Sequence, residues 1–182
     1  HLDTPLESAT VINAAWHFAQ RLHSDAAWLP LENEQRQALI DFCQPDALRT
    51  KLERELGDQP DSLRRLNYRV AHFERWPPLG LVVHITPGNA PLLAFCAVIE
   101  SLLAGNINWL RPSSSDRGLT AQLLSGLLQC DPSGHLRHYL AVLPAATADI
   151  GRLCKLADGV SAWGGETALQ AIRAQLPPGC RW

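Results

Sequence analysis

The sequence has no methionine, few tyrosines and phenylalanines, and no apolar run long enough to cross a membrane. A transmembrane helix needs about 20 predominantly apolar residues, so no membrane span is predicted. The amino terminus also lacks a basic segment followed by an apolar one, which argues against a secretory signal. The missing methionine suggests that the sequence begins inside a longer gene product or carries an added segment at its start.

Neither basic nor acidic residues predominate in the sequence. The 16 basic and 18 acidic residues give a formal net charge of −2, so neither nucleic acid nor an anionic membrane is an expected partner. The five cysteines form no CxxC pair, and their odd number argues against a disulfide framework and for a reducing, cytoplasmic location. The seven histidines show no HExxH or similar ligand spacing, so no metal site is expected.

The chain is organised around residues 79–112, which read LGLVVHITPGNAPLLAFCAVIESLLAGNINWLRP. Residues 79–86 form the nearly continuous apolar run of a strand buried on both faces. Pro91 suits the first turn of a helix that runs to Leu103, and Gly105 ends it before a second strand at 107–110. A helix of this length carries the chain back to the edge where the first strand began, so the two strands run parallel. In parallel sheets of this kind, ligands bind beyond the carboxyl ends of the strands.

Before this unit the spacing of apolar residues predicts helices over 10–22, 32–43 and 45–56, followed by an edge-type strand over 66–76. After it, we expect helix 116–128 with Asp116 at its N-cap, strand 139–143, helix 145–156, strand 159–163 and helix 166–174. The alternation of strand and helix predicts an α/β fold with an open, mainly parallel, doubly wound sheet. We expect a helical segment over residues 1–58, packed on the sheet of an α/β nucleotide-binding domain over 59–182.

Three motifs, TPGNAP, LLAGNINWLRPSSSD and VSAWGGETALQAIR, resemble the aldehyde dehydrogenase superfamily. The segment ahead of the first strand, and WGG in place of the commoner Phe-Thr-Gly-Ser, are most similar to the LuxC-like fatty acyl-CoA reductases. The resemblance covers residues 76–173 and fits the preceding helices only loosely. It implies an NADPH or NADH cofactor and an acyl-CoA or acyl-carrier thioester substrate. A GxGxxG fingerprint is absent after the first strand, as it is in the superfamily.

The resemblance also assigns roles to residues of these motifs. Asn89 corresponds to the amide that donates a hydrogen bond to the thioester oxygen as negative charge develops, the role of an oxyanion hole. Arg111 corresponds to the basic residue beside the adenosine ribose, and a guanidinium suits a 2′-phosphate, which favours NADPH. The remaining cofactor-binding residues implied are Thr86, Pro87, Gly88, Ser113, Ser114, Trp163, Gly164 and Gly165.

Residue type alone leaves ordinary alternatives open at these positions. Asn89 could satisfy a turn or cap the following helix. Arg111 could be a solvated side chain at a strand end. Gly164 and Gly165 could be plain turn formers, and most of the six tryptophans are expected in the core or an interface.

One departure from the superfamily concerns its nucleophile, a cysteine that accepts the acyl group. The resemblance places that cysteine in a catalytic domain beyond residue 182, because Cys180 follows WGG too closely and the other cysteines lie in or beside helices. We therefore expect a cofactor-binding segment of an acyl-CoA or acyl-carrier reductase that is inactive by itself, with a homo-oligomer or an acyl-transferring protein as possible partners. The alternative is a non-catalytic α/β interaction or assembly module derived from the same fold.

Overall fold

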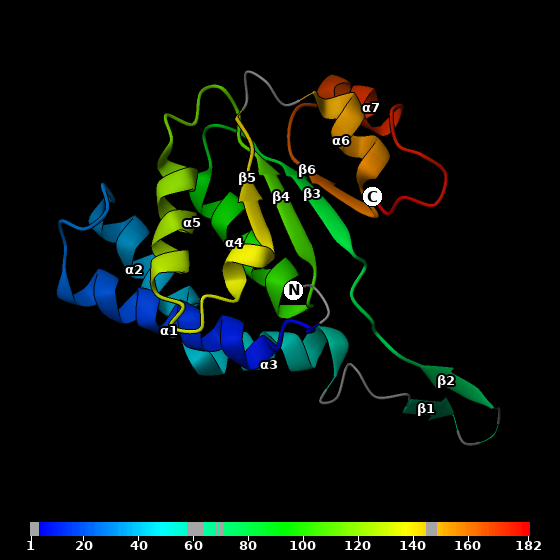
Figure 1. The fold of residues 1–182 in the computed structure, drawn as a ribbon, viewed down its shortest axis with the longest axis horizontal. Helices are drawn as coiled ribbons and strands as arrows, with labels where there is room; N and C mark the ends of the chain where they lie inside the picture. Colours follow the sequence, from blue (N-terminus) through cyan, green and yellow to red (C-terminus); the bar gives the residue numbers. More distant parts are fainter. Residues whose placement is uncertain (1–3, 58–63, 68, 70, 145–148) are drawn as a thin grey trace.

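The computed structural model describes residues 4–57, 64–67, 69, 71–144 and 149–182. At its centre lies a parallel sheet with the strand order β5-β4-β3-β6, made by β3 (Leu81–Ile85), β4 (Ile107–Arg111), β5 (Leu140–Val142) and β6 (Gly159–Ala162). The sheet is open and has helices on both faces (Figure 1). The predicted fold class is confirmed.

The central unit forms as its sequence predicts. Helix α4 (Pro91–Leu103) begins with proline at its first position, where no intrahelical N–H bond is lost. It ends at Ala104, and Gly105 follows with a φ of 78°, a conformation that glycine adopts at little cost. The chain then enters β4 directly, in parallel register with β3.

The two faces of the sheet are covered by different helices. Helix α4 and α5 (Leu119–Gln129) belong to the larger apolar core, together with η1 (Leu136–His138) and β5. Helices α6 (Ile150–Leu156) and α7 (Glu166–Arg173) pack with β3 and β6 in a second core that contains Val83 and Val160. This arrangement makes the sheet doubly wound.

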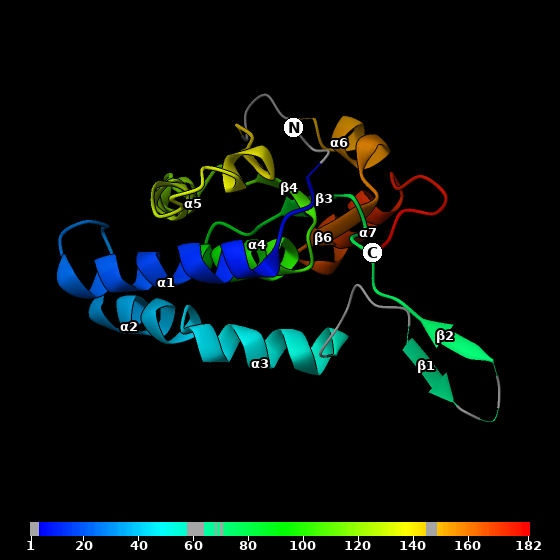
Figure 2. The same cartoon turned by 60° about the horizontal axis from the view of Figure 1, so that its bottom comes forward.

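The three amino-terminal helices are α1 (Ser8–Ser24), α2 (Asn33–Phe42) and α3 (Pro45–Leu56), and α2 and α3 follow one another along α1 (Figure 2). They cover the sheet indirectly, because their main contacts with the α/β part are to α4 and α5. Phe18 of α1 stacks on Phe95 of α4 with ring centroids 5.0 Å apart, and both rings are fully buried. The division of the chain near residue 58 remains a prediction.

The single edge strand predicted over residues 66–76 is wrong. The structure has two short strands, β1 (Arg64–Asn67) and β2 (His72–Glu74), which pair antiparallel as a separate hairpin that projects from the body (Figure 1). The alternation of apolar and polar residues did not reveal this reversal, because the connecting residues include no glycine or proline to mark a turn. Tyr68 and Val70, which belong to the predicted edge strand, lie outside the described residues.

Two predicted helix starts are also corrected. Helix α5 begins at Leu119 with Gly118 at the N-cap position, although Asp116 Oδ1 still accepts a bond from the N–H of Thr120 at 3.4 Å. Helix α6 begins at Ile150 rather than 145, because Asp149 caps it by accepting the N–H of Arg152 at 2.9 Å. Residues 145–148, included in that predicted helix, lie outside the described residues.

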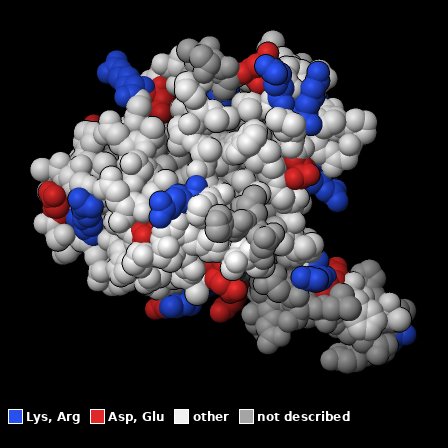
Figure 3. Space-filling view, in the orientation of Figure 1, with Lys and Arg blue, Asp and Glu red and all other residues white. Residues whose placement is uncertain are grey.

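The surface in Figure 3 shows Lys and Arg interspersed with Asp and Glu and separated by wide uncharged areas. This face therefore carries no large field of one sign. Among the described residues, no helix is both long and apolar enough to span a membrane.

Candidate functional site

The carboxyl ends of three neighbouring strands meet at one edge of the sheet. Ile85 at the end of β3 pairs with Arg111 at the end of β4 and with Ala162 at the end of β6. The chain proceeds from β3 to β4 and β5 on one side, and then returns to place β6 on the other side of β3. In open α/β sheets, ligands bind where the strand order reverses in this way, here between the ends of β3 and β6.

The loops that follow β3 and β4 touch each other. The N–H of Thr86 donates to the carbonyl of Arg111 at 3.3 Å, and Thr86 is buried. A Cβ atom at Gly88 would overlap the hydroxyl of Ser115 and lie 2.9 Å from its Cβ and 3.1 Å from Ser113 Oγ. Gly88 is therefore required by a close approach of two segments more than 20 residues apart, which no local pattern in the sequence could reveal.

Asn89 lies in the turn between β3 and α4, and it is exposed. The N-cap position of α4 is occupied by Ala90, and no side chain caps this helix. The alternative that Asn89 caps α4 is therefore wrong. Its role as an oxyanion donor stays a prediction, consistent with an accessible amide at a strand end.

The third loop joins β6 to α7. The N–H of Trp163 donates to the carbonyl of Ile85 at 3.0 Å, which fixes the start of this loop against the end of β3. Gly164 and Gly165 are exposed, and Gly165 is the N-cap residue of α7 without any side-chain cap. Exposed backbone N–H groups at a helix amino terminus can bind an anion such as a pyrophosphate.

The loop after β4 carries the predicted ribose-binding residues. Arg111 and Ser113 are half-buried, and Ser114 is exposed. The hydroxyls of Ser113 and Ser115 lie 3.0 Å apart. Asp116, the first acidic residue of this loop, is buried, with Oδ1 held by the hydroxyl of Thr120 at 3.1 Å. The carboxylate is thus engaged with the start of α5.

Sequence reasoning missed a buried polar pair inside the sheet, next to this site. His84 of β3 and Asn108 of β4 are 2% and 0% exposed, and His84 Nε2 lies 2.9 Å from Asn108 Oδ1. The imidazole also lies parallel to the indole of Trp163, with ring centroids 6.5 Å apart. A histidine within an otherwise apolar strand, LVVHI, is the signal that could have drawn attention to it.

None of the five cysteines, all of which are described, is activated as a nucleophile. Burial raises the pKa of Cys43, and the neighbouring Cys96 raises it further. Burial raises the pKa of Cys96 to about 12 and also raises those of Cys130, Cys154 and Cys180. At neutral pH these groups are thiols rather than thiolates, so they react poorly with a thioester.

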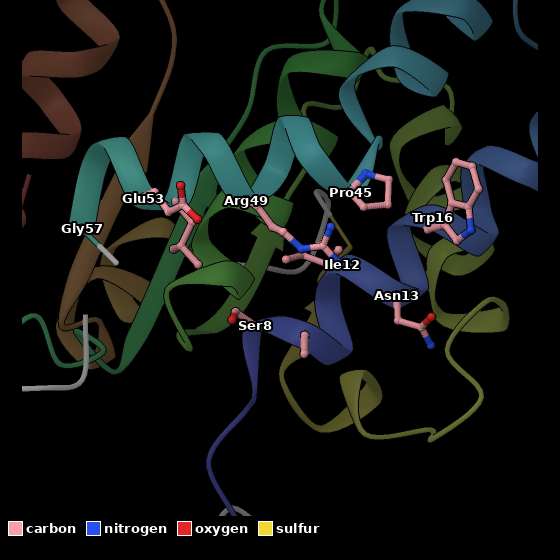
Figure 4. A pocket seen from close by; sticks show the side chains of 10 residues that line it. Ser8, Ile12, Asn13, Trp16, Pro45, Arg49, Glu53 and Gly57 are labelled. Atoms are coloured by element: carbon pink, nitrogen blue, oxygen red, sulfur yellow. The ribbon is translucent and has the colours of Figure 1, made fainter. Parts of the chain in front are cut away.

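Five hollows of the described surface lie away from the loops at the carboxyl ends of the strands. A cavity of about 530 Å³ lies between α1 and α3, with Ile12, Trp16 and Leu52 among its lining and Arg49 and Glu53 of α3 at its side (Figure 4). Its lining includes no cysteine or histidine, and it is remote from the loops at the carboxyl ends of the strands. Its lining offers nothing that matches thioester chemistry, so the strand ends remain the stronger candidate. Within the described part of the chain, no group of His, Cys, Asp or Glu side chains could hold a metal ion.

The fold is similar to that of solved aldehyde dehydrogenases. The NAD-dependent benzaldehyde dehydrogenase from Corynebacterium glutamicum matches 98% of this chain, and 41% of that chain, with a TM-score of 0.65 and 18% identity. Betaine aldehyde dehydrogenase from Staphylococcus aureus, solved with NAD+, matches 94% of this chain and 35% of that chain, with a TM-score of 0.67 and 17% identity.

The sequence identifies the family of this chain. Residues 4–182 match the family described as Acyl-CoA reductase (LuxC), and the chain belongs to this family. It is also 26% identical over 141 residues to the long-chain acyl-protein thioester reductase of Photorhabdus luminescens. That match covers 75% of this chain but only 29% of the Photorhabdus protein. The resemblance stated from the motifs is thereby confirmed.

Proposed function

We propose that this chain is the cofactor-binding part of an NADPH- or NADH-dependent reductase that converts an acyl thioester into an aldehyde. The observation that carries the proposal is the meeting of three loops at the point where the strand order reverses, in a member of the acyl-CoA reductase family. The name of the Photorhabdus relative favours a protein-bound acyl group over acyl-CoA as the substrate.

The residues at the strand ends fit a dinucleotide. Gly164 and Gly165 are exposed glycines, and a Cβ at Gly165 would meet no atom within 4 Å, which leaves room for close approach by a ligand. The uncapped amino terminus of α7 would bind the pyrophosphate through backbone N–H groups. Arg111, Ser113 and Ser114 would bind the adenosine ribose, and Thr86, Pro87, Gly88 and Trp163 would line the crevice beside it.

The bound cofactor would supply a hydride to the carbonyl carbon of the thioester, whose C–S bond breaks as the thiol leaves with a proton. The contribution of this chain is to hold the reactants and to stabilise charge. The side-chain N–H of Asn89 would donate to the carbonyl oxygen as it gains negative charge, and a donor fixed in advance is most effective there. The cysteine that carries the acyl group would lie outside these residues.

The choice between NADPH and NADH rests on Arg111. A guanidinium binds a phosphate through charge-assisted hydrogen bonds worth roughly 1.5–3 kcal/mol. The carboxylate nearest in sequence, Asp116, is buried and bonded to Thr120 rather than exposed to repel a phosphate. We therefore infer a preference for NADPH.

Calorimetric titration of this chain with NADPH and NADH tests the proposal. Arg111→Ala should weaken NADPH binding more than NADH binding, by roughly 10- to 150-fold for 1.5–3 kcal/mol. Arg54→Ala, which removes an exposed arginine from the far end of α3, is the matched control and should leave both affinities unchanged. Equal losses for both cofactors, or a wild-type preference for NADH, would refute the assignment of Arg111. Absence of binding to either would favour an interaction module instead.

A further inference from the structure

A chain of buried polar groups runs through the sheet beneath the proposed cofactor site. His84 Nε2 lies 2.9 Å from Asn108 Oδ1, and Asn108 Nδ2 donates to the carbonyl of Asn106 at 2.8 Å. The side chain of Asn106 in turn accepts the N–H of Leu79 at 2.7 Å and donates to Ser101 Oγ at 3.3 Å. His84, Asn106 and Asn108 are each at most 6% exposed, and the two contacts of Asn108 are buried, whereas those of Asn106 with Leu79 and Ser101 are part-buried.

These bonds fix the tautomer of His84. Because the amide nitrogen of Asn108 is used by the carbonyl of Asn106, its oxygen faces the imidazole, and His84 Nε2 must carry the proton. Burial lowers the pKa of His84, against a smaller opposing effect of the bond to Asn108, so the ring is neutral. Nδ1 is then a bare acceptor, buried and without a hydrogen-bond partner among the described residues.

An unpaired buried nitrogen is destabilising, and a leucine in this strand would avoid it. The imidazole therefore does not serve stability alone, and its surroundings indicate another role. Its flat face lies parallel to the indole of Trp163 at an angle of 12°, with centroids 6.5 Å apart, within the range of aromatic pairs. Trp163 is the first residue of the loop between β6 and α7.

Beyond Trp163, this loop has no side chain that could hold it to the sheet, although the carbonyl of Gly165 accepts the N–H groups of Ala168 and Leu169 of α7 at 3.0 and 3.1 Å. The next two residues are Gly164 and Gly165, both exposed and without side chains. A Cβ at Gly164 would meet only Ala168 of α7, at 3.7 Å, and one at Gly165 would meet nothing within 4 Å. Trp163 links the start of this loop to the sheet, through its backbone bond to Ile85 and its contact with His84.

We propose that His84 is a positioning residue for the proposed cofactor site, whose imidazole, held by Asn108, sets the orientation of Trp163 and thereby the affinity of the glycine loop for NADPH. This inference rests on the proposed function. The polar side chain of His84 in an otherwise apolar strand then has a role, because its buried bond to Asn108 contributes to cofactor binding.

Fluorine NMR of the chain labelled with 5-fluorotryptophan tests the first half of the inference without a ligand. The six tryptophans give six signals, and the signal of Trp163 is the one missing from Trp163→Leu. His84→Gln, which keeps a donor for Asn108 but removes the ring, should move this signal and leave the others in place. His23→Gln, an exposed histidine on α1, is the matched control and should change none. An unmoved Trp163 signal in folded His84→Gln would overturn the proposal.

Titration with NADPH tests the second half through a double-mutant cycle. An aromatic pair of this kind predicts that His84→Gln weakens NADPH binding by roughly two- to tenfold. The same change in the Trp163→Leu background should have no further effect, whereas an equal loss in both backgrounds would overturn the coupling. If His84→Gln fails to fold, His84→Phe replaces it; this ring lacks the bond to Asn108 and should also move the Trp163 signal and weaken NADPH binding. An unmoved signal with unchanged affinity in folded His84→Phe would overturn the proposal.

The two proposals fail in different ways. A wild-type chain that binds neither NADPH nor NADH would refute the proposed function, and with it the claim that His84 affects cofactor affinity. The ligand-free fluorine signal would still decide whether His84 orients Trp163. Normal NADPH binding with no coupling between the two residues would refute only the role of His84.

Discussion

Replacing Gly88 with alanine tests whether the loops after β3 and β4 are held against each other. The added methyl group would overlap the hydroxyl of Ser115 and lie 2.9 Å from its Cβ, a distance that real Cβ atoms do not tolerate. The hydroxyl can rotate away, but the Cβ of Ser115 moves only if the backbone of one loop moves. The backbone at Gly88 is not in the left-handed region, so the expected effect is steric.

The size of the effect follows from the kind of displacement required. Adding a methyl group to a contact that is already close costs typically 1–3 kcal/mol, because backbone and side chains must shift to accept it. Ser115→Gly removes both clashing atoms and leaves Ser113 Oγ, a rotatable hydroxyl at 3.1 Å, as the nearest neighbour. In that background, Gly88→Ala should cost less than about 1 kcal/mol, which gives a coupling of about 1–2 kcal/mol between the two positions.

Urea unfolding of the four variants in this cycle, followed by circular dichroism, measures these free energies. Gly164→Ala is the control for exchanging glycine with alanine, because Gly164 is not in the left-handed region and its new Cβ would meet only the Cβ of Ala168, at 3.7 Å. It should leave stability unchanged or raise it by up to about 1 kcal/mol. If Gly88→Ala costs the same with glycine at position 115 as with serine, the two loops do not touch as the structure has them.

Three further outcomes are expected. In the intact protein, Asn89→Ala should lower turnover by about two to three orders of magnitude with an unchanged melting temperature, and a lower melting temperature with preserved turnover would point to a structural role. The 182-residue chain alone should form no aldehyde from any acyl thioester; aldehyde formation that stops when one of its cysteines is alkylated would contradict this. Burial opposes ionisation of Asp131, but hydrogen bonds from Ser133 and Leu136 outweigh it and lower its pKa. The stability that this carboxylate contributes is therefore present above the unfolded pKa of about 3.9 and is lost as the pH falls through the lower folded pKa. The Asp131→Asn variant should be less stable than the wild type at pH 7, and its stability should fall less as the pH is lowered. Urea unfolding between pH 2 and 7 measures both differences.

The elements that the sequence predicted well are those specified by neighbouring residues. The unit from β3 to β4 follows from an apolar run, a proline at the start of α4 and a glycine after its end, all of which act within a few residues. The hairpin of β1 and β2 was missed because its reversal carries no glycine or proline. Residues with strong local preferences, such as proline and glycine, mark where an element begins or ends. Where they are absent, the alternation of apolar and polar residues does not distinguish one strand from two.

The candidate site was predicted only in part for a related reason. Motif resemblance selected the loops after β3, β4 and β6, and the structure brings them to one edge of the sheet. The contact of Gly88 with Ser115, and the pairing of His84 with Asn108, depend on how strands lie next to each other. A single sequence does not contain that register, so these residues could be recognised only once the sheet was assembled.

The stacking of Phe18 on Phe95 has a consequence for how the chain unfolds. The two rings belong to one apolar core that joins α1, α2 and α3 to α4 and α5, across the hairpin that separates these groups in sequence. Amide hydrogens of α1 and α4 should therefore exchange with solvent in the same opening event rather than independently. During synthesis, the first three helices can pack on one another, but the apolar face that contacts α4 and α5 stays uncovered until those helices follow.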